Sequence, residues 1–504
     1  MKRFVERLTA YFSIVLLSIL SVSLLFGYAY MQMTMQEQPM ILAENHWFVT
    51  ALLPLLVLLF VLLKVCLKSN IRANHIVLIF SLCYLAFGIY MILHAPLGLR
   101  ADVQSCLEDA KSFGENHPAD VLQPGSYLFT YPHQLGLVSL FRILGPLADP
   151  KTLFSLNLLA VLLVQVMQVR ISAMLFQNDR ITKITALLSY LFLPPLFFIL
   201  FAYNTLYSLA FAMAGIYFLL RFEKKKQLLC LAASLLCLVL ATLLRGNLVI
   251  LLIAIAITLL LKALYQKRWL YVAAALLPIL CYMLASKGLI SSYARWSNQD
   301  LPGLPQKAWI SIGLNNGGNG VPGMFSSKYI QLFNEMDFDV EETETQLNTI
   351  IAERLEYLYA NPVQAANFFW AKIQNTWTDP LFQSIWSGPL SKELSFQRIQ
   401  PSLLYEIYDD SSLNKHIALT LRGLLLLIYA FAALGIHRLF KNKLLLNCLY
   451  IPLYFIGGFL FHLFWETKSQ YVVSHVYMLI PLAAYGLAQL RFLQGKETKE
   501  TVEK

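Results

Sequence analysis

The chain has 504 residues, of which 58% are hydrophobic and 13% charged, with a formal net charge of +10 and a mean hydropathy of +0.59. A soluble domain is about 45–50% apolar and about 25% charged, so too few charges are present here to cover a water-facing surface, and a soluble globular protein is excluded. Seven cysteines are too few for a disulfide framework.

Long apolar runs recur along the chain, and a membrane-spanning helix needs about 20 mostly apolar residues. Twelve segments meet that test: 10–31, 47–67, 75–95, 152–170, 182–202, 205–220, 228–243, 247–264, 269–286, 417–436, 444–464 and 471–490. The apolar segment 135–148 is too short to span and is expected to be interfacial or re-entrant. The sequence therefore predicts an all-α polytopic membrane protein with about twelve transmembrane helices and extracytoplasmic loops that bear interfacial helices.

The positions of Lys and Arg predict the orientation. If the N-terminus is inside, the seven cytoplasmic segments hold 23 of the 39 basic residues and 6 of the 29 acidic ones, which leaves 16 and 23 elsewhere. This is the bias of the positive-inside rule, so both termini are expected in the cytoplasm of a multi-pass cell-membrane protein. The basic excess is then a topology signal. The run Lys224–Lys226 is interpreted as an anchor, and no nucleic-acid partner is expected because no such motif accompanies it.

This topology divides the chain into six parts. They are the N-terminal spans in 1–95, a first extracytoplasmic loop with an interfacial helix in 96–151, spans four to nine in 152–286, a large extracytoplasmic loop in 287–416, the last three spans in 417–490 and a cytoplasmic tail in 491–504. The pattern of the large loop predicts an amphipathic helix at 341–360. Polar side chains at the outer ends of the spans are the candidates for a site.

The first outer loop offers a carboxylate and a cluster of rings. Asp102 follows the third span at the membrane–water boundary, where a lower dielectric makes a carboxylate a better base, although a solvated acid beside Arg100 is the alternative. Tyr131, His133 and Gln134 stand where the chain returns toward the bilayer. Such groups suit a sugar ring or a lipid headgroup, and an aromatic membrane anchor is the alternative for the tyrosine.

Cations and further polar groups lie at other outer ends. Arg245, with Asn247 two residues on, interrupts a continuous apolar run, and a cation at headgroup level suits a phosphate. The short loop before the last span and the first turn beyond it supply Glu466, Lys468, Tyr471 and His475. Charges at membrane depth are costly and indicate function by default, although these could be merely interfacial.

Together these segments resemble the GT-C glycosyltransferases, polytopic enzymes that use lipid-phosphate-linked sugars. Within them the chain is most similar to the bacterial branch related to protein O-mannosyltransferases and the lipid A aminoarabinose transferase. The likeness spans roughly 75–490 and rests on short motifs. These are Asp102 after an early span, Tyr131-Pro132-His133-Gln134, Arg245-Gly246-Asn247, Trp377-Thr378-Asp379 before the C-terminal spans, and the segment from Glu466 to Tyr471.

The resemblance implies an acid that acts as catalytic base or metal contact, which falls on Asp102. It also implies a basic or polar group that holds the lipid phosphate, which falls on Arg245 and, as second candidate, on Lys468. Many relatives carry two adjacent acids, whereas Val103 follows Asp102 here. This departure from the family pattern argues against a requirement for a metal; a divalent metal stays an option, and no cofactor is assigned.

The expected function is transfer of a sugar from a polyprenyl-phosphate-linked donor to an extracytoplasmic acceptor on a cell-surface glycan, lipid or protein. A cell-wall polysaccharide polymerase or ligase and a non-enzymatic lipid-linked sugar transporter are the alternatives. A transporter would carry charged groups in the middle of several spans, whereas here the polar groups collect at the outer ends, which favours an enzyme.

Overall fold

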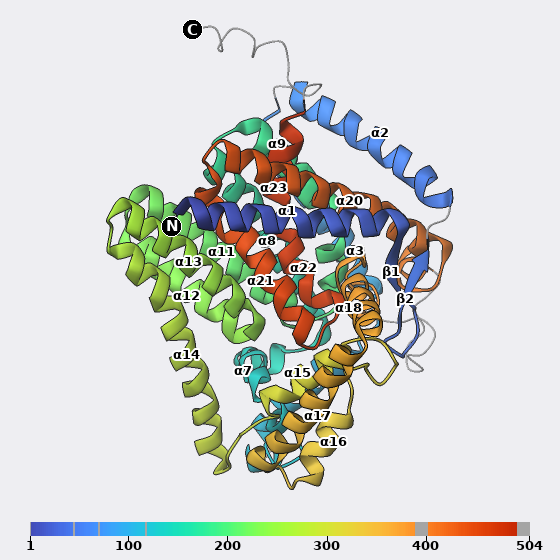
Figure 1. Cartoon of the computed structure of the whole chain (residues 1–504), viewed down its shortest axis with the longest axis vertical. Coiled ribbons are helices and arrows are strands. Elements are labelled where there is room, and N and C mark those ends of the chain that lie inside the picture. Colours follow the sequence, from blue (N-terminus) through green and yellow to red (C-terminus); the bar gives the residue numbers. More distant parts are fainter. Residues whose placement is uncertain (1, 44–45, 69–70, 116–117, 389–401, 491–504) are drawn as a thin grey trace.

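A computed structural model describes residues 2–43, 46–68, 71–115, 118–388 and 402–490. The predicted tail 491–504 and part of the large loop, 389–401, lie outside the described residues. The described chain is almost entirely helical, with one two-stranded sheet (Figure 1).

Within these ranges, several helices are long and apolar enough to cross a membrane. Seven qualify singly: α1 (Lys2–Phe26), α3 (Ala73–His94), α8 (Pro150–Phe176), α11 (Asn204–Lys225), α13 (Val249–Gln266, preceded by the 3-10 turn η4, Gly246–Leu248), α14 (Leu270–Ser297) and α20 (Ser412–Lys441). Two bent pairs bring the number to nine: α9 (Asp179–Leu191) with α10 (Pro194–Phe197) and η3 (Phe198–Leu200), and α22 (Ser469–Tyr477) with α23 (Ile480–Ala488). A multi-pass helical membrane protein is thus confirmed.

The remaining three predicted spans are apolar helices of 10–17 residues, shorter than the length expected for a span. They are Leu52–Leu67 within α2 (His46–Lys68), α12 (Leu228–Leu244) and α21 (Tyr450–Phe464). All twelve predicted segments therefore contain helix, whereas only seven to nine have the length of a full crossing. Proline accounts for the bends, because it lacks the N–H that an unbroken helix needs, and Pro194 and Pro481 stand in the first turns after the breaks.

One short β-hairpin interrupts the helical architecture. The first span was predicted to run over 10–31, but α1 ends at Phe26 and the chain turns into β1 (Gly27–Met31), which pairs antiparallel with β2 (Pro39–Ala43). The fully buried Arg422 donates to the carbonyls of Leu24 at 2.8 Å and Leu25 at 3.2 Å. These carbonyls lack helical partners at the end of α1, so the guanidinium serves as its cap.

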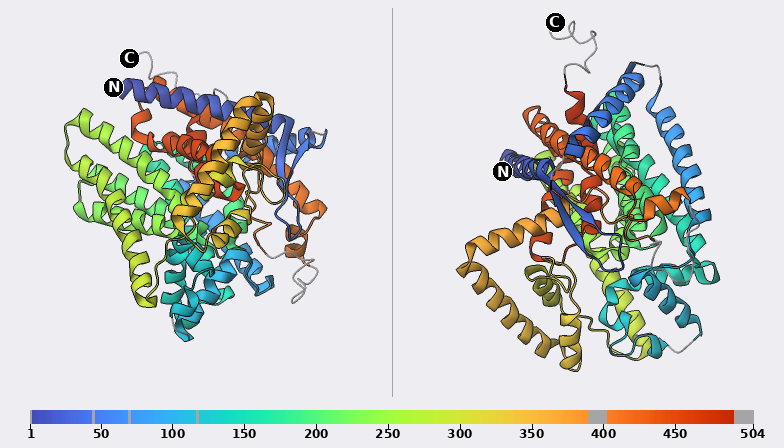
Figure 2. Two further views of the ribbon diagram at one scale, coloured as in Figure 1. Left: turned by 60° about the horizontal axis from the view of Figure 1, so that its bottom comes forward. Right: turned by 90° about the vertical axis from the view of Figure 1, so that its right-hand side faces the viewer.

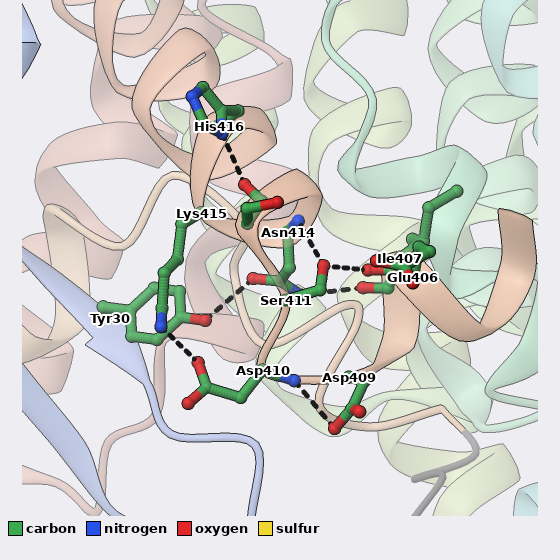
Figure 3. Close-up of polar contacts among 10 residues, drawn as sticks. Tyr30, Glu406, Ile407, Asp409, Asp410, Ser411, Asn414, Lys415 and His416 are labelled. Atoms are coloured by element: carbon green, nitrogen blue, oxygen red, sulfur yellow. Dashed lines mark hydrogen bonds and ion pairs between the residues drawn. The ribbon is translucent and has the colours of Figure 1, made fainter.

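The hairpin is fastened to the start of α20. Tyr30 on β1 donates its hydroxyl to Asn414 Oδ1 at 2.8 Å, and Asn414 Nδ2 donates to the carbonyl of Ile407 at 2.7 Å (Figure 3). Ile407 belongs to α19 (Leu403–Tyr408). An ion pair between Lys415 and Asp410 at 3.0 Å lies beside these bonds. Strand β1 is therefore bound through Tyr30 to the start of α20.

The remaining helices come from the predicted outer loops. They are α4 (Ala101–Glu115), α5 (Pro118–Val121), α6 (Tyr127–Thr130), η1 (Pro132–Gln134), α7 (Leu135–Leu144), η2 (Gly145–Leu147), α15 (Gln306–Leu314), α16 (Lys328–Glu335), α17 (Val340–Ala360) and α18 (Pro362–Trp377), while η5 (Leu445–Cys448) joins α20 to α21. The predicted helix at 341–360 is confirmed as α17, and 135–148 folds as the short α7 with η2. Figure 1 and the right-hand view of Figure 2 show α7 and α15–α17 toward the lower end, away from both termini.

Candidate active site

The loop between α21 and α22 is held from two sides by backbone hydrogen bonds. The N–H of Glu466 donates to the carbonyl of Trp309 at 3.0 Å, and the N–H of Thr467 donates to the carbonyl of Gly323 at 2.8 Å. Trp309 lies on α15, from the large loop. Because these bonds join segments more than 140 residues apart in sequence, the position of Glu466 depends on the large loop as well as on the last spans.

A buried lysine adds a second support to this loop. Lys372 on α18 donates its ammonium to the carbonyls of Leu463 at 3.0 Å and Trp465 at 2.9 Å, and also to that of Gly313. Desolvation lowers the pKa of Lys372 to about 7, against the opposing negative charge of Glu466. A Cβ on Gly313 would stand 2.3 Å from a backbone oxygen of the α21 end, so only glycine allows α15 to approach this closely.

Glu466 is buried, with 5% of its surface exposed. Desolvation raises the pKa of its carboxyl to about 7; Lys468 opposes this rise, while the negative charges of Glu37 and Asp102 add to it. The hydroxyl of Tyr471 donates to Glu466 Oε1 at 3.4 Å. Glu466 is thus a carboxyl that exchanges its proton near neutral pH, which is the range useful for acid–base chemistry.

The structure adds a site residue that sequence reasoning missed. Glu37, in the turn between β1 and β2, forms an ion pair with Lys468 at 2.7 Å and accepts from Gln383 Nε2 at 3.2 Å. Desolvation works against the charge of Lys468, but Glu37 and Glu466 outweigh it and raise the pKa of Lys468 above its ordinary value. Lys468 therefore stays protonated with its charge largely matched by Glu37. The sequence contains a feature that could have identified Glu37. The predicted topology places residues 32–46 outside the membrane, and Glu37 is the first acidic residue in that segment.

Asp102 stands in the first turn of α4, directly after Ala101, whose φ of +48° lies in the left-handed region. Asp102 keeps access to water, yet the surrounding protein raises the pKa of its carboxyl by desolvation. Lys468 lowers that pKa, Glu37 raises it, and a hydrogen bond from Tyr127 lowers it. Strained backbone persists where the surroundings enforce it, so the position of Asp102 is imposed by the fold.

The neighbouring Arg100 contacts groups that lie far away in the sequence. Its guanidinium lies 4.4 Å from the ring centre of Trp386 and donates to the carbonyls of Trp386 and Gly388. Trp386 in turn donates its indole N–H to the carbonyl of Thr34 at 2.8 Å. Arg100 therefore joins the start of α4 to the hairpin turn that carries Glu37.

The Tyr131–Gln134 segment lines the same site. Burial first, and then the nearby negative charges of Asp102 and Glu466, raise the pKa of Tyr131. The ring of Trp309 lies 5.9 Å from that of Tyr131 and 6.2 Å from that of His133. Gln134 donates its amide N–H to the hydroxyl of Tyr203. Trp309 and Tyr203 were not among the predicted site residues, because isolated aromatic residues in this apolar sequence give no signal.

Arg245 lies between α12 and the turn that precedes α13, at the edge of the site. Its guanidinium donates to Thr205 Oγ1 at 2.5 Å, to Asn247 Oδ1 at 3.2 Å and to the carbonyl of Gln470 at 3.3 Å, and it lies 5.7 Å from the ring centre of Tyr471. Every one of these acceptors is neutral. Among the residues that the structure describes, no carboxylate lies within ion-pair distance of Arg245, so the charge is available to an anionic ligand.

Three predicted site residues occupy buried packing positions instead. Trp377, 1% exposed, packs its ring against those of Phe455 and Phe459. Asp379 accepts hydrogen bonds from two backbone N–H groups and, at 2.6 Å, from Ser469 at the start of α22. His475 stacks on Tyr454 with ring centres 3.8 Å apart. These contacts fix the C-terminal helices around the site.

The acids of the site do not fit the metal that the family resemblance allows. No group of three or more His, Cys, Asp or Glu side chains that could hold a metal ion occurs in the described part of the chain. Glu37 is instead bound to Lys468.

Comparison with known proteins does not add a family. No protein-family model matches the chain, and no curated protein or solved structure is similar enough to show a relationship.

The raised pKa of Glu466 predicts a pH-dependent stability. A glutamate ordinarily ionises near 4.5, and Glu466 does so near 7 in the fold. Wild-type protein should therefore lose stability as the pH rises through this window, because ionisation costs more in the folded state. Glu466→Gln cannot ionise, so its stability relative to wild type should grow by up to roughly 3 kcal/mol across the window.

Thermal unfolding of purified protein at about pH 5 and about pH 8, in one lipid–detergent mixture, measures this difference. Glu356→Gln, at an exposed position of α17, is the matched control. It keeps Glu466, so it should lose stability with rising pH as the wild type does. A difference between Glu466→Gln and wild type that stays constant with pH would contradict the shifted pKa.

Proposed function

We propose that this protein is a membrane glycosyltransferase of the GT-C type, which moves a sugar from a polyprenyl-phosphate-linked donor to a hydroxyl of an extracytoplasmic acceptor. Cell-surface glycans, lipids and proteins are the acceptor classes. In this proposal the chain crosses the membrane twelve times, with α2, α12 and α21 as tilted or locally shortened crossings, and the site faces outward.

The observation that supports this proposal best is the pairing of charges in the site. Lys468 is matched by Glu37, whereas Arg245 is held by neutral acceptors. Arg245 contacts the ring of Tyr471, whose hydroxyl reaches Glu466. One uncompensated cation thus stands beside a carboxyl cluster, as transfer from a phosphate to a hydroxyl requires: a cation for the leaving phosphate and a base for the acceptor.

The proposed reaction is a direct displacement. The acceptor oxygen attacks the anomeric carbon and its proton passes to the carboxylate of Asp102, while the bond from the anomeric carbon to the phosphate oxygen breaks. The electron pair leaves with polyprenyl phosphate, and Arg245 stabilises the negative charge. Displacement in one step inverts the anomeric centre. The rings of Tyr131 and Trp309 suit the apolar faces of a sugar.

The same geometry weighs against the non-enzymatic transporter. Charges inside the apolar helices are few, and several are satisfied locally. Lys262 pairs with Glu223 at 2.7 Å, Lys183 pairs with Asp179 at 2.9 Å, and Arg422 binds backbone carbonyls of α1. A wall-polysaccharide polymerase or ligase would use a similar site and differs from the proposal in its acceptor.

Purified protein in proteoliposomes, supplied with radiolabelled polyprenyl-phosphate sugars and membrane extract as acceptor source, tests the function. Label should move from the lipid to a product that no longer carries the polyprenyl chain, and not with Asp102→Asn protein. Transfer of a preassembled glycan with no use of single-sugar donors would favour the polymerase or ligase. Movement of intact donor across the bilayer without transfer would favour the transporter.

The orientation predicts which engineered cysteines react with a membrane-impermeant reagent. In a cysteine-free background, Glu342→Cys at an exposed position of α17 should be labelled in intact cells, and Lys441→Cys at the exposed end of α20 only after permeabilisation. The reason is the concentration of basic residues near the predicted cytoplasmic span ends. The reverse labelling pattern would contradict the predicted orientation and place the site on the cytoplasmic side.

A further inference from the structure

A second polar hollow lies far from the carboxyl site, at the opposite ends of the helices. It is a cavity of about 380 Å³ at the end of α11, the α13–α14 turn and η5, lined by Glu223, Lys226, Lys262, Arg268, Tyr271 and Asn447 among others. Figure 1 shows these helix ends on the flank that holds the N-terminus, away from α7 and α15–α17. Nothing in the proposed transfer reaction uses these residues.

The cations of this cavity exceed its acids. The one carboxylate, Glu223, is engaged by the buried Lys262 at 2.7 Å. Lys226 donates to the hydroxyl of Tyr271 at 2.7 Å, a neutral partner. Over the described ranges of the chain, neither Lys226 nor Arg268 forms an ion pair. Two positive charges therefore remain for a bound anion, and phosphate is the group that Arg and Lys bind together through charge-assisted hydrogen bonds.

A buried hydroxyl beneath the cavity lacks a partner. Tyr450 is 4% exposed, and its hydroxyl has no hydrogen-bond partner among the described residues. It lines a small hollow of about 10 Å³ that shares Glu223 and Lys262 with the larger cavity. This volume is close to the minimum for one water. A water there would join Tyr450 to a ligand held above it.

The surroundings of the cavity place it at the level of lipid headgroups. Trp269, beside Arg268, is 83% exposed, and tryptophan concentrates at membrane–water interfaces. On the other side, Leu228 and Leu229 at the start of α12 are 64% and 81% exposed. An apolar surface thus continues from the cationic cavity toward the bilayer core, which suits a molecule with a phosphate headgroup and acyl chains more than a soluble phosphate.

We propose that this cavity binds the phosphate headgroup of an anionic phospholipid, in the leaflet that the positive-inside rule makes cytoplasmic. Lys226 and Arg268 contact the phosphate, and the acyl chains lie along Leu228 and Leu229. Basic pockets between membrane helices on this side are suited to such headgroups. The bound lipid ties α11, α13 and α14 together on the far side from the carboxyl site. The proposal does not depend on the transferase activity.

The test compares full-length protein in nanodiscs of phosphatidylcholine with and without phosphatidylglycerol. The readouts are the midpoint of thermal unfolding and the lipid retained in native mass spectrometry. The variant Lys226→Asn/Arg268→Gln removes both free charges, and asparagine tolerates the left-handed backbone of Lys226, whose φ is +57°. At about 1 kcal/mol for each cation near the membrane surface, phosphatidylglycerol affinity should fall about 30-fold.

The matched control is Lys224→Asn/Lys225→Asn. It removes two exposed lysines at the end of α11 that do not line the cavity. This control should keep the stabilisation by phosphatidylglycerol. An equal loss in both variants would show general surface attraction and overturn the site. Equal stabilisation of the wild type by soluble glycerol phosphate would overturn the lipid assignment, and a wild type that does not respond to phosphatidylglycerol would overturn the proposal altogether.

Discussion

Asp102→Asn should lower the rate of sugar transfer by about 100- to 10,000-fold, the usual cost of losing a positioned general base. Asparagine keeps the size of the side chain but cannot take the proton of the acceptor hydroxyl. The carboxyl is held by the first turn of α4 and by a hydrogen bond from Tyr127, so the substitution should change chemistry more than structure. Transfer rates at equal amounts of folded protein measure the effect.

Two further variants distinguish the loss of the base from effects of other residues in its loop and around its carboxyl. Asp120→Asn, at an exposed position in the same outer loop, should leave the rate unchanged. Tyr127→Phe removes a hydrogen bond that lowers the pKa of Asp102, so that pKa should rise. Because the base must be ionised, the acid limb of the pH–rate profile should then move to higher pH.

The competing candidate is Glu466, whose pKa of about 7 also suits acid–base work. If Asp102→Asn transfers sugar at nearly the wild-type rate while Glu466→Gln is inactive, the base lies on the last outer loop. Glu466 then takes the acceptor proton, and Asp102 contributes only to the field around it. If Asp102→Asn and Glu466→Gln are both inactive and Tyr127→Phe shifts the acid limb of the pH–rate profile, Asp102 remains the assigned base.

Much of the site could be predicted because membrane topology sorts residues in space. Apolar runs and basic residues predict the spans and their direction. Polar groups at the predicted outer ends of the spans are then expected on the same side of the membrane. Asp102, Arg245 and Glu466 are far apart in the sequence. In the structure Tyr471 contacts both Arg245 and Glu466, and the charge of Asp102 acts on Glu466. The sequence therefore indicated which ends meet but not which side chains touch.

The contacts that the sequence did not indicate have a common physical origin. Asp379 and Glu466 are both buried acids, but Asp379 accepts hydrogen bonds from two backbone N–H groups and from Ser469, whereas Glu466 accepts one from Tyr471 at 3.4 Å. Nothing local in the sequence distinguishes these two cases. Glu37 was missed because its role depends on a hairpin that pairs with α18 and α20 at long range, and the apolar run of the first span concealed the strand.

Arg245→Ala should reduce kcat/KM for the donor by about 10- to 150-fold, because a charge-assisted contact to phosphate contributes roughly 1.5–3 kcal/mol. Arg245→Lys should lose much less, since it keeps a positive charge at headgroup level. Its neutral acceptors, Thr205, Asn247 and the carbonyl of Gln470, leave the guanidinium charge uncompensated. Donor titrations with both variants in the same lipid mixture measure the difference.

Binding of the product separates a phosphate contact from a structural role. Arg245→Ala should lose affinity for polyprenyl phosphate but keep that for polyprenol, because only the former carries the anion. Arg295→Ala, at an exposed position near the end of α14, should bind both as wild type does. If Arg245→Ala bound polyprenyl phosphate normally, the lipid phosphate would be assigned to Lys468. Glu37→Gln, which removes the carboxylate paired with Lys468 at 2.7 Å, should in that case strengthen phosphate binding.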